Sequence, residues 1–192
     1  MGYKMNKDNA EKLLFAVADV LESHGAEFFL YGGTFLGAVR DGDFIDCDRD
    51  IDLGILLENL APVAHDVAHD LRALGIRAEI VDHRHKTEWD GGIYAIKFRA
   101  FGEHGDLAGF KAVKNLRIIP SHARLFWLTH TPRLIEELGF IEFRGRMFRC
   151  PLNADEYLTE KYDDWRTPHT EFGNISKPTC RLTEDQMTEF LK

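Results

Sequence analysis

The apolar positions in the first part of the chain predict a helix, a strand and a sharp turn, in that order. Between Lys7 and His24 they recur at helical spacing, which is typical of an amphipathic helix, and Gly25 is a typical stop. The next run, from Glu27 to Tyr31, is short, aromatic and apolar, so it predicts a buried strand. We expect this strand to lead directly into the pair Gly32-Gly33.

The rest of the chain alternates between helix-like and strand-like patterns. Helices are predicted over 62–74, near 133–138, after Asn153 and after Thr183. Strands are predicted over 76–81, over 92–101, from Asp106 onwards and in a hairpin of 140–143 with 147–150. Turn-like compositions separate them at 82–90 and 102–105. This mixture predicts an α/β (α+β) architecture in which helices flank a small mixed sheet.

Two acidic residues interrupt an apolar stretch that reads as a strand. Asp50 and Asp52 lie two residues apart, so on a strand both carboxylates would point to the same face. Like charges held that close repel unless a cation lies between them, and Mg²⁺ takes one or two protein carboxylates together with substrate phosphates. Asp48 has the same parity and is expected to hydrogen-bond a ligand or a ligating carboxylate, whereas Asp43 and Asp46 are expected to be surface acids in a turn.

The glycine pair supplies the other half of such a site. Gly32 and Gly33 let the backbone turn sharply, and the helix predicted from Thr34 to Arg40 starts with unpaired N–H groups that suit a phosphate. Taken separately, an Asp-x-Asp pattern is common at surfaces and Gly-Gly is common in turns. Their combination, with the acids in an apolar run where uncompensated charge is costly, favours a metal and phosphate site.

Composition narrows the class of protein. A length of 192 residues suits one domain over 1–192, and 44% apolar with 29% charged residues is ordinary for a globular protein. The net charge of -8 argues against a nucleic-acid polymer as partner. The 3 cysteines form no CxxC pair, and no apolar run approaches the roughly 20 residues of a membrane-spanning helix. We therefore expect a cytoplasmic protein without a transmembrane segment.

Two separated motifs resemble the LicD/fukutin family of nucleotidyltransferase-fold phosphotransferases. The first joins Gly32-Gly33-Thr34-Phe35-Leu36-Gly37-Ala38-Val39-Arg40 to Asp48-Arg49-Asp50-Ile51-Asp52-Leu53. The second joins Pro151-Leu152-Asn153-Ala154-Asp155-Glu156-Tyr157-Leu158 to Tyr162-Asp163-Asp164-Trp165-Arg166-Thr167-Pro168. This chain departs from the family pattern at Arg49, which stands inside an otherwise acidic run, and at Asp46-Cys47, where a Pro-Trp pair is common.

The resemblance implies a nucleotidyltransferase (polymerase beta-like) fold and a third acid on a later strand. Asp106 occupies that place in the order of elements, while its competitor Glu103 is expected to face solvent in a turn. By resemblance, Mg²⁺ or Mn²⁺ would bind Asp50, Asp52 and Asp106, and Asp106 or Asp52 would activate an acceptor hydroxyl. The phosphate contacts it implies are Gly32, Gly33, the Thr34 hydroxyl and Arg40, with Asp48 beside them. Lys111, Lys114 and Arg117 are further candidates for phosphate contacts, or form a solvated strand edge.

The activity implied by the resemblance is transfer of a phosphorylated alcohol or sugar, such as phosphocholine or a polyol phosphate. The donor would be a CDP-type nucleotide and the acceptor a hydroxyl of a glycan or a related molecule. One alternative is a nucleotidyltransferase that moves NMP from an NTP to a small molecule or protein. Another is a non-catalytic nucleotide-binding regulatory protein, which Arg49 in the acidic run favours. Cleavage of a CDP-alcohol and release of pyrophosphate from an NTP distinguish the two enzymes.

Overall fold

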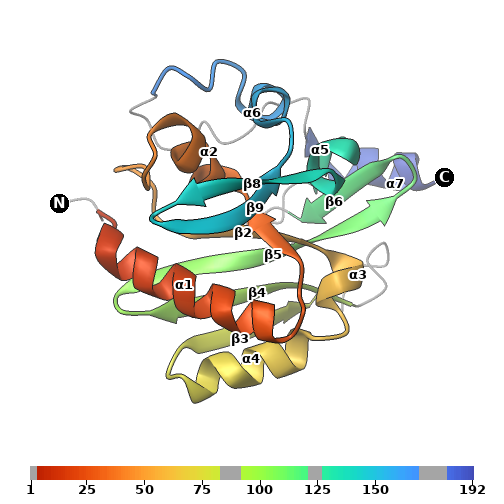
Figure 1. Ribbon diagram of the computed structural model, residues 1–192. Coiled ribbons are helices and arrows are strands. Elements are labelled where there is room, and N and C mark those ends of the chain that lie inside the picture. Colours follow the sequence, from red (N-terminus) through yellow and green to blue (C-terminus); the bar gives the residue numbers. More distant parts are fainter. Residues whose placement is uncertain (1–3, 83–91, 121–126, 169–180) are drawn as a thin grey trace.

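The computed structural model contains both helices and strands and describes residues 4–82, 92–120, 127–168 and 181–192 (Figure 1). The helices are α1 (Lys7–Ser23), α2 (Gly32–Arg40), α3 (Leu57–Leu60), α4 (Ala64–Ala73), α5 (Arg133–Glu136), α6 (Ala154–Tyr162) and α7 (Glu184–Leu191). The strands are β1 (Phe28–Leu30), β2 (Ile51–Leu56), β3 (Arg77–Asp82), β4 (Ile93–Ala100), β5 (Glu103–Val113), β6 (Leu116–Pro120), β7 (Trp127–His130), β8 (Leu138–Phe143), β9 (Arg146–Pro151) and β10 (Arg181–Leu182). No helix in these ranges is both long and apolar enough to cross a membrane.

The main sheet is mixed and is organised around β5. The first part of β5 pairs with β2 in parallel and with β4 antiparallel, and β1 and β3 extend these two sides. The last residues of β5 pair with β6, which continues the sheet through β7 to β10. In the parallel pair, Asp52 lies directly opposite Asp106. The predicted α/β architecture with a mixed sheet and flanking helices is confirmed.

One face of this sheet is apolar and packs against helices. Leu53 and Leu107 are register partners, and with Ile96 and Phe98 on the neighbouring strand they belong to the main hydrophobic core. The helices α1 and α4 contact each other and this side of the sheet, as Figure 1 shows. Because side chains alternate between the faces of a strand, Asp52 and Asp106 project from the opposite face.

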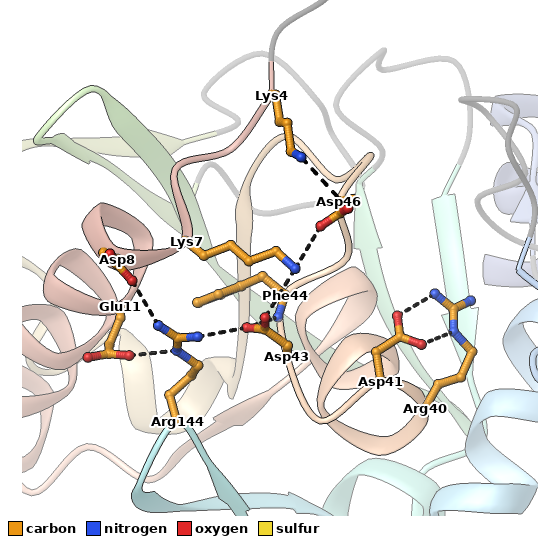
Figure 2. A network of polar contacts seen from close by, with 10 residues as sticks. All are labelled: Lys4, Lys7, Asp8, Glu11, Arg40, Asp41, Asp43, Phe44, Asp46 and Arg144. Carbon is orange, nitrogen blue, oxygen red and sulfur yellow. Dashed lines mark hydrogen bonds and ion pairs between the residues drawn. The ribbon is translucent and has the colours of Figure 1, made fainter.

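Ion pairs fasten the loop between α2 and β2 to two other elements (Figure 2). Lys7 of α1 contacts Asp46 at 2.7 Å and Asp43 at 3.1 Å. Arg144, in the turn of the β8–β9 hairpin, contacts Asp43 at 3.1 Å and Glu11 of α1 at 2.6 Å. The sequence correctly predicted Asp43 and Asp46 as acids of a turn, and the hairpin with it.

Several boundaries differ from the prediction. The helix α2 begins at Gly32 instead of Thr34, and β2 begins at Ile51, so Asp50 and Asp48 precede the strand rather than lie on it. The strand β7 was not predicted from the sequence. The predicted turn at 82–90 lies, beyond residue 82, outside the described residues, and residue 82 itself ends β3.

The prediction for Glu103 was wrong. The turn before it is shorter than 102–105, because Phe101 and Gly102 both adopt positive φ values of 57° and 86° and reverse the chain by themselves. The strand β5 therefore starts at Glu103, whose side chain is buried and accepts a hydrogen bond from the Asn6 backbone N–H at 3.0 Å. Glu103 is a structural contact of α1 and does not face solvent.

Candidate metal and phosphate site

Three carboxylates converge on the side of β2 and β5 that faces away from α1 and α4. Asp50, Asp52 and Asp106 each offer an oxygen, and these oxygens all lie within 4.8 Å of one another. The pairing of β2 with β5 brings Asp52 and Asp106 together, and Asp50 is the residue before β2. Asp106 is 6% exposed and the other two are half-buried. Such a set of carboxylate oxygens fits a hard divalent cation such as Mg²⁺ or Mn²⁺.

The glycine pair lies directly against this group. Gly32 has a φ of +55°, and a Cβ atom there would lie 2.2 Å from Asp52 Oδ2. A Cβ atom at Gly33 would lie 2.1 Å from Asp48 Oδ2. The absence of side chains therefore lets the backbone approach the two acids, and the Gly33 N–H donates to Asp52 Oδ2 at 2.6 Å.

Thr34 joins the helix α2 to the strand that carries Asp52. Its Oγ1 accepts a hydrogen bond from the Asp52 backbone N–H at 2.9 Å, and the residue is 1% exposed. The Tyr31 N–H adds a second link to the same residue by donating to the Asp52 carbonyl at 3.3 Å. The observed role of the Thr34 hydroxyl is thus to position Asp52.

Burial and neighbouring acids raise the pKa values of two acids at this site. Burial is the main reason that the pKa of Asp52 is well above its usual value, and the charges of Asp50, Asp48 and Asp106 raise it further. Burial and the nearby Asp50 raise the pKa of Asp48 to about 7, against a hydrogen bond from the Arg49 backbone N–H that lowers it. A bound divalent cation would favour the ionised forms of these carboxylates.

The structure also shows the surroundings of Asp48 and Arg40, two of the residues predicted to contact substrate. Asp48 lies against Gly33, next to the three acids, although it is not on the strand as its sequence parity suggested. The Arg40 guanidinium forms a two-point contact with its neighbour Asp41, at 2.8 Å from Nε and 2.7 Å from Nη2 (Figure 2). A phosphate contact of Arg40 stays a prediction.

Among the other basic candidates, Arg117 is held by acids. Its Nη2 contacts Glu58 at 2.7 Å and its Nε contacts Glu136 at 2.6 Å, so it links α3 to α5. Lys114 lies with its Nζ 5.2 Å from the centre of the Phe190 ring. These contacts place both cations in the packing of the second half of the sheet.

The sequence interpretation missed a buried cation behind the site. Lys161 of α6 is 4% exposed, and its Nζ lies 3.5 Å from the centre of the Tyr31 ring, one residue before Gly32. Its charge lowers the pKa of Asp52 and, after burial, is the second cause that lowers the pKa of His130. The sequence contained one indication that Lys161 is buried. It follows Tyr157, which was expected on the buried side of the helix, by four residues and so lies on the same face.

Sequence comparison identifies the family of this domain. The model of the LicD/FKTN/FKRP nucleotidyltransferase domain matches residues 25–153, a range that contains the glycine pair and all three acids. The human ribitol 5-phosphate transferase FKRP is 52% identical over 169 residues, and the mouse protein is 29% identical over 169 residues. Each match covers 82% of this chain and 32% of the relative, so the chain spans about a third of the length of these curated relatives.

Structural comparison gives weaker similarities. The crystal structure of ANT(2")-Ia in complex with adenylyl-2"-tobramycin has a TM-score of 0.46 and 18% identity, covering 73% of this chain and 67% of that one. The terminal uridylyl transferase 4 from Trypanosoma brucei with bound GTP has a TM-score of 0.38 and 14% identity, covering 59% and 33%. The family assignment comes from the match over 25–153: the chain belongs to the LicD/FKTN/FKRP family and contains its nucleotidyltransferase domain.

Proposed function

We propose that this domain is a metal-dependent phosphotransferase that moves a phosphorylated polyol or sugar from a CDP-type donor to a hydroxyl of a glycan or a related acceptor. The observation that carries the proposal is the convergence of Asp50, Asp52 and Asp106 beside the pair Gly32-Gly33. Membership of the LicD/FKTN/FKRP family supports the reaction class. The relatives named ribitol 5-phosphate transferases support a polyol phosphate as the transferred group.

In this proposal the three carboxylates hold Mg²⁺ or Mn²⁺. When bound, the cation supplies positive charge to the donor phosphates and to the leaving nucleotide. The Gly33 N–H fixes one oxygen of Asp52, so the carboxylate is oriented before substrate arrives. The start of α2 faces the site with backbone N–H groups, which favour a phosphate at this position.

The acceptor must lose a proton while the donor loses a nucleotide. A carboxylate oxygen of Asp106 or Asp52 that does not hold the cation accepts the proton of the acceptor hydroxyl. The oxygen of that hydroxyl then bonds to the phosphorus that carries the polyol or sugar, and the bond to CMP breaks. Burial of Asp106 keeps this carboxylate in one orientation beside its strand partner Asp52.

The test is a screen of nucleotide donors followed by phosphorus NMR. The purified chain is incubated with Mg²⁺ or Mn²⁺, a polyol or glycan acceptor, and either a CDP-alcohol such as CDP-ribitol, CDP-glycerol and CDP-choline or one of the NTPs. The proposal predicts CMP and a new phosphodiester from a CDP-alcohol. Pyrophosphate from an NTP would instead support nucleotidyl transfer, and metal and nucleotide binding without any turnover would support a regulatory protein.

A further inference from the structure

Two rows of charged side chains cross the sheet on the face that carries the acids. Register partners on neighbouring strands project to the same face, so pairing alone defines each row. The first row runs across β3, β4, β5 and β2 through Glu79, Lys97, Asp106 and Asp52. The second row lies two residues from the first on each strand and runs through Arg77, Arg99 and His104. Because Ile51 pairs with Gly105, the second row points toward Asp50.

Burial shows that the parts of these rows on β3 and β4 face solvent, whereas Asp106 on β5 is buried. Along β4, Ile96 and Phe98 are 1% and 2% exposed, whereas Lys97 and Arg99 are exposed. Along β3, Ala78 is buried and Arg77 is exposed. The cations therefore project away from the side that α1 and α4 cover, and His104 is half-buried where the row approaches the acids.

The second row places like charges directly opposite each other. Arg77 and Arg99 are register partners, an arrangement that destabilises a sheet when no anion lies between them. In the first row the acid Glu79 lies opposite Lys97, but the second row has no acid on β3 or β4. Neither guanidinium forms a hydrogen bond or ion pair with another residue that the structure describes. In a chain with a net charge of -8, this is a local concentration of phosphate-binding groups.

The position of the row relative to the acids suggests what binds there. The helix α2 and its glycine pair lie against β2, on one side of the carboxylates. Arg99 and Arg77 lie on β4 and β3, on the other side of β5. A ligand with one phosphate at the glycine pair and the cation site would extend across β5 and bring a further anionic group over the arginines.

We propose that Arg77 and Arg99, with His104 beside them, bind a substrate phosphate other than the one held at the cation site. The identity of that substrate rests on the proposed function, but phosphate binding by the row does not. The phosphate belongs either to the nucleotide donor or to a phosphorylated acceptor. Both sources share the chemistry that the guanidinium groups recognise, which is a phosphate ester with at least one negative charge.

Calorimetry with pyrophosphate and inorganic phosphate in the presence of EDTA tests the row without any metal or turnover. Replacing one arginine of the site, in Arg99→Gln or Arg77→Gln, should weaken pyrophosphate binding about tenfold. The matched control is Arg149→Gln, because Arg149 lies in the separate β8–β9 sheet and the substitution changes the net charge equally. Equal binding by wild type, Arg99→Gln and Arg77→Gln, or equal weakening by the control, would overturn the proposal.

Circular dichroism checks the fold of each variant, and both substituted side chains are exposed. A third variant, Arg99→Lys, keeps the charge but loses the planar two-point geometry, so it should bind with intermediate affinity. If Arg99→Gln does not fold, this variant and Arg77→Gln decide the result by the same comparison with Arg149→Gln.

Steady-state kinetics with CDP-alcohol donors distinguishes the two sources of the phosphate. A KM for the donor that rises in Arg99→Gln assigns the row to the donor. A KM that rises only for a phosphorylated acceptor, and not for the same acceptor without phosphate, assigns it to the acceptor. Unchanged KM values for all three substrates would show that the row is not a substrate site. If the wild type transfers nothing, the proposed function fails while the calorimetric result still decides the phosphate site.

Discussion

The backbone N–H of Gly33 donates a 2.6 Å hydrogen bond to Oδ2 of Asp52. Through this bond, the start of α2 and the strand β2 share a contact at the centre of the candidate site. The Thr34 hydroxyl adds a second contact in the reverse direction, by accepting from the Asp52 N–H. The carboxylate that would hold a cation is therefore oriented by the same segment that would receive the phosphate.

Removal of one carboxylate should separate metal binding from stability. We expect Asp52→Asn to weaken Mn²⁺ binding by at least about 100-fold and to abolish transfer, because a ligand is lost. Without metal, the same variant should melt at a higher temperature than wild type at pH 8, because repulsion within the acid group falls. Calorimetry and thermal melts measure the two effects. The control is Asp66→Asn, at an exposed position on α4. An Mn²⁺ affinity of Asp52→Asn equal to that of wild type would remove the site assignment.

Alanine substitution should lower the stability of the fold more at Gly32 than at Gly33. Gly32→Ala combines an unfavourable φ with close approach to Asp52, so we expect a destabilisation of about 1–3 kcal/mol. In Gly33→Ala the added methyl group meets the end of the Asp48 side chain, which can move. We therefore expect this variant to weaken metal binding more than it lowers the stability of the fold. Chemical denaturation and Mn²⁺ titration test this order.

The control for both glycine variants is Gly92→Ala. No atom lies within 4 Å of a Cβ at Gly92, and its backbone is not in the left-handed region. Its stability and metal affinity should match those of wild type. A Gly32→Ala protein as stable as Gly92→Ala would contradict the close packing of the glycine pair against the acids.

Stability without metal should fall as the pH rises from about 4 to about 7. The unfolded carboxyl of Asp48 loses its proton near 3.8, whereas in the folded protein its pKa is raised to about 7. Between these values the folded state binds more protons, so a rise in pH favours unfolding. Mn²⁺ should remove this loss, because it binds the ionised carboxylates and releases protons.

Thermal melts in EDTA and in Mn²⁺ over this pH range provide the measurement. Other acids titrate in the same range, so the effect of Asp48 is the difference between wild type and Asp48→Asn. Without metal, that difference should grow with pH, the variant being the more stable of the two at pH 7. A constant difference would mean that the pKa of Asp48 is not raised by the fold.

The buried Lys161 should set the pH at which the site binds metal. Lys161→Met removes the charge and keeps a side chain of similar length, so the ionised form of Asp52 loses a stabilising neighbour. We expect the midpoint of Mn²⁺ binding to move to higher pH while the fold is retained. Mn²⁺ titrations from pH 5 to 9 measure the midpoint, with Lys12→Met as a control on the exposed side of α1. Equal midpoints in all three proteins would show that Lys161 acts only in packing.

The elements that could be predicted are those whose signal is local. The first helix was predicted over 7–24, and α1 forms over 7–23. Thr183 and Gln186 form a capping box at the start of α7, as their spacing indicates. The convergence of Asp50, Asp52 and Asp106 is not local. It was expected from the order of elements in the resembling family, and the parallel pairing of β2 with β5 confirms it.

The interactions that were missed join residues far apart in the sequence. Glu103 is buried because Asn6 donates to it across 97 positions, and Arg117 is held by Glu58 across 59 positions. The row of Arg77 and Arg99 depends on the register between β3 and β4, which the alternation within either strand does not define. Local patterns and the family resemblance therefore predicted the three acids that converge but not their electrostatic surroundings.

The contact of Arg144 with Asp43 ties the acid-bearing loop to the turn of the β8–β9 hairpin. A small molecule that binds between these two side chains would break the ion pair and free the segment leading to Asp48 and Asp50. It would not compete with nucleotide or acceptor. Inhibition of this kind would persist at saturating substrate. The hairpin turn is thus a place where the enzyme activity proposed for this domain could be controlled from a distance.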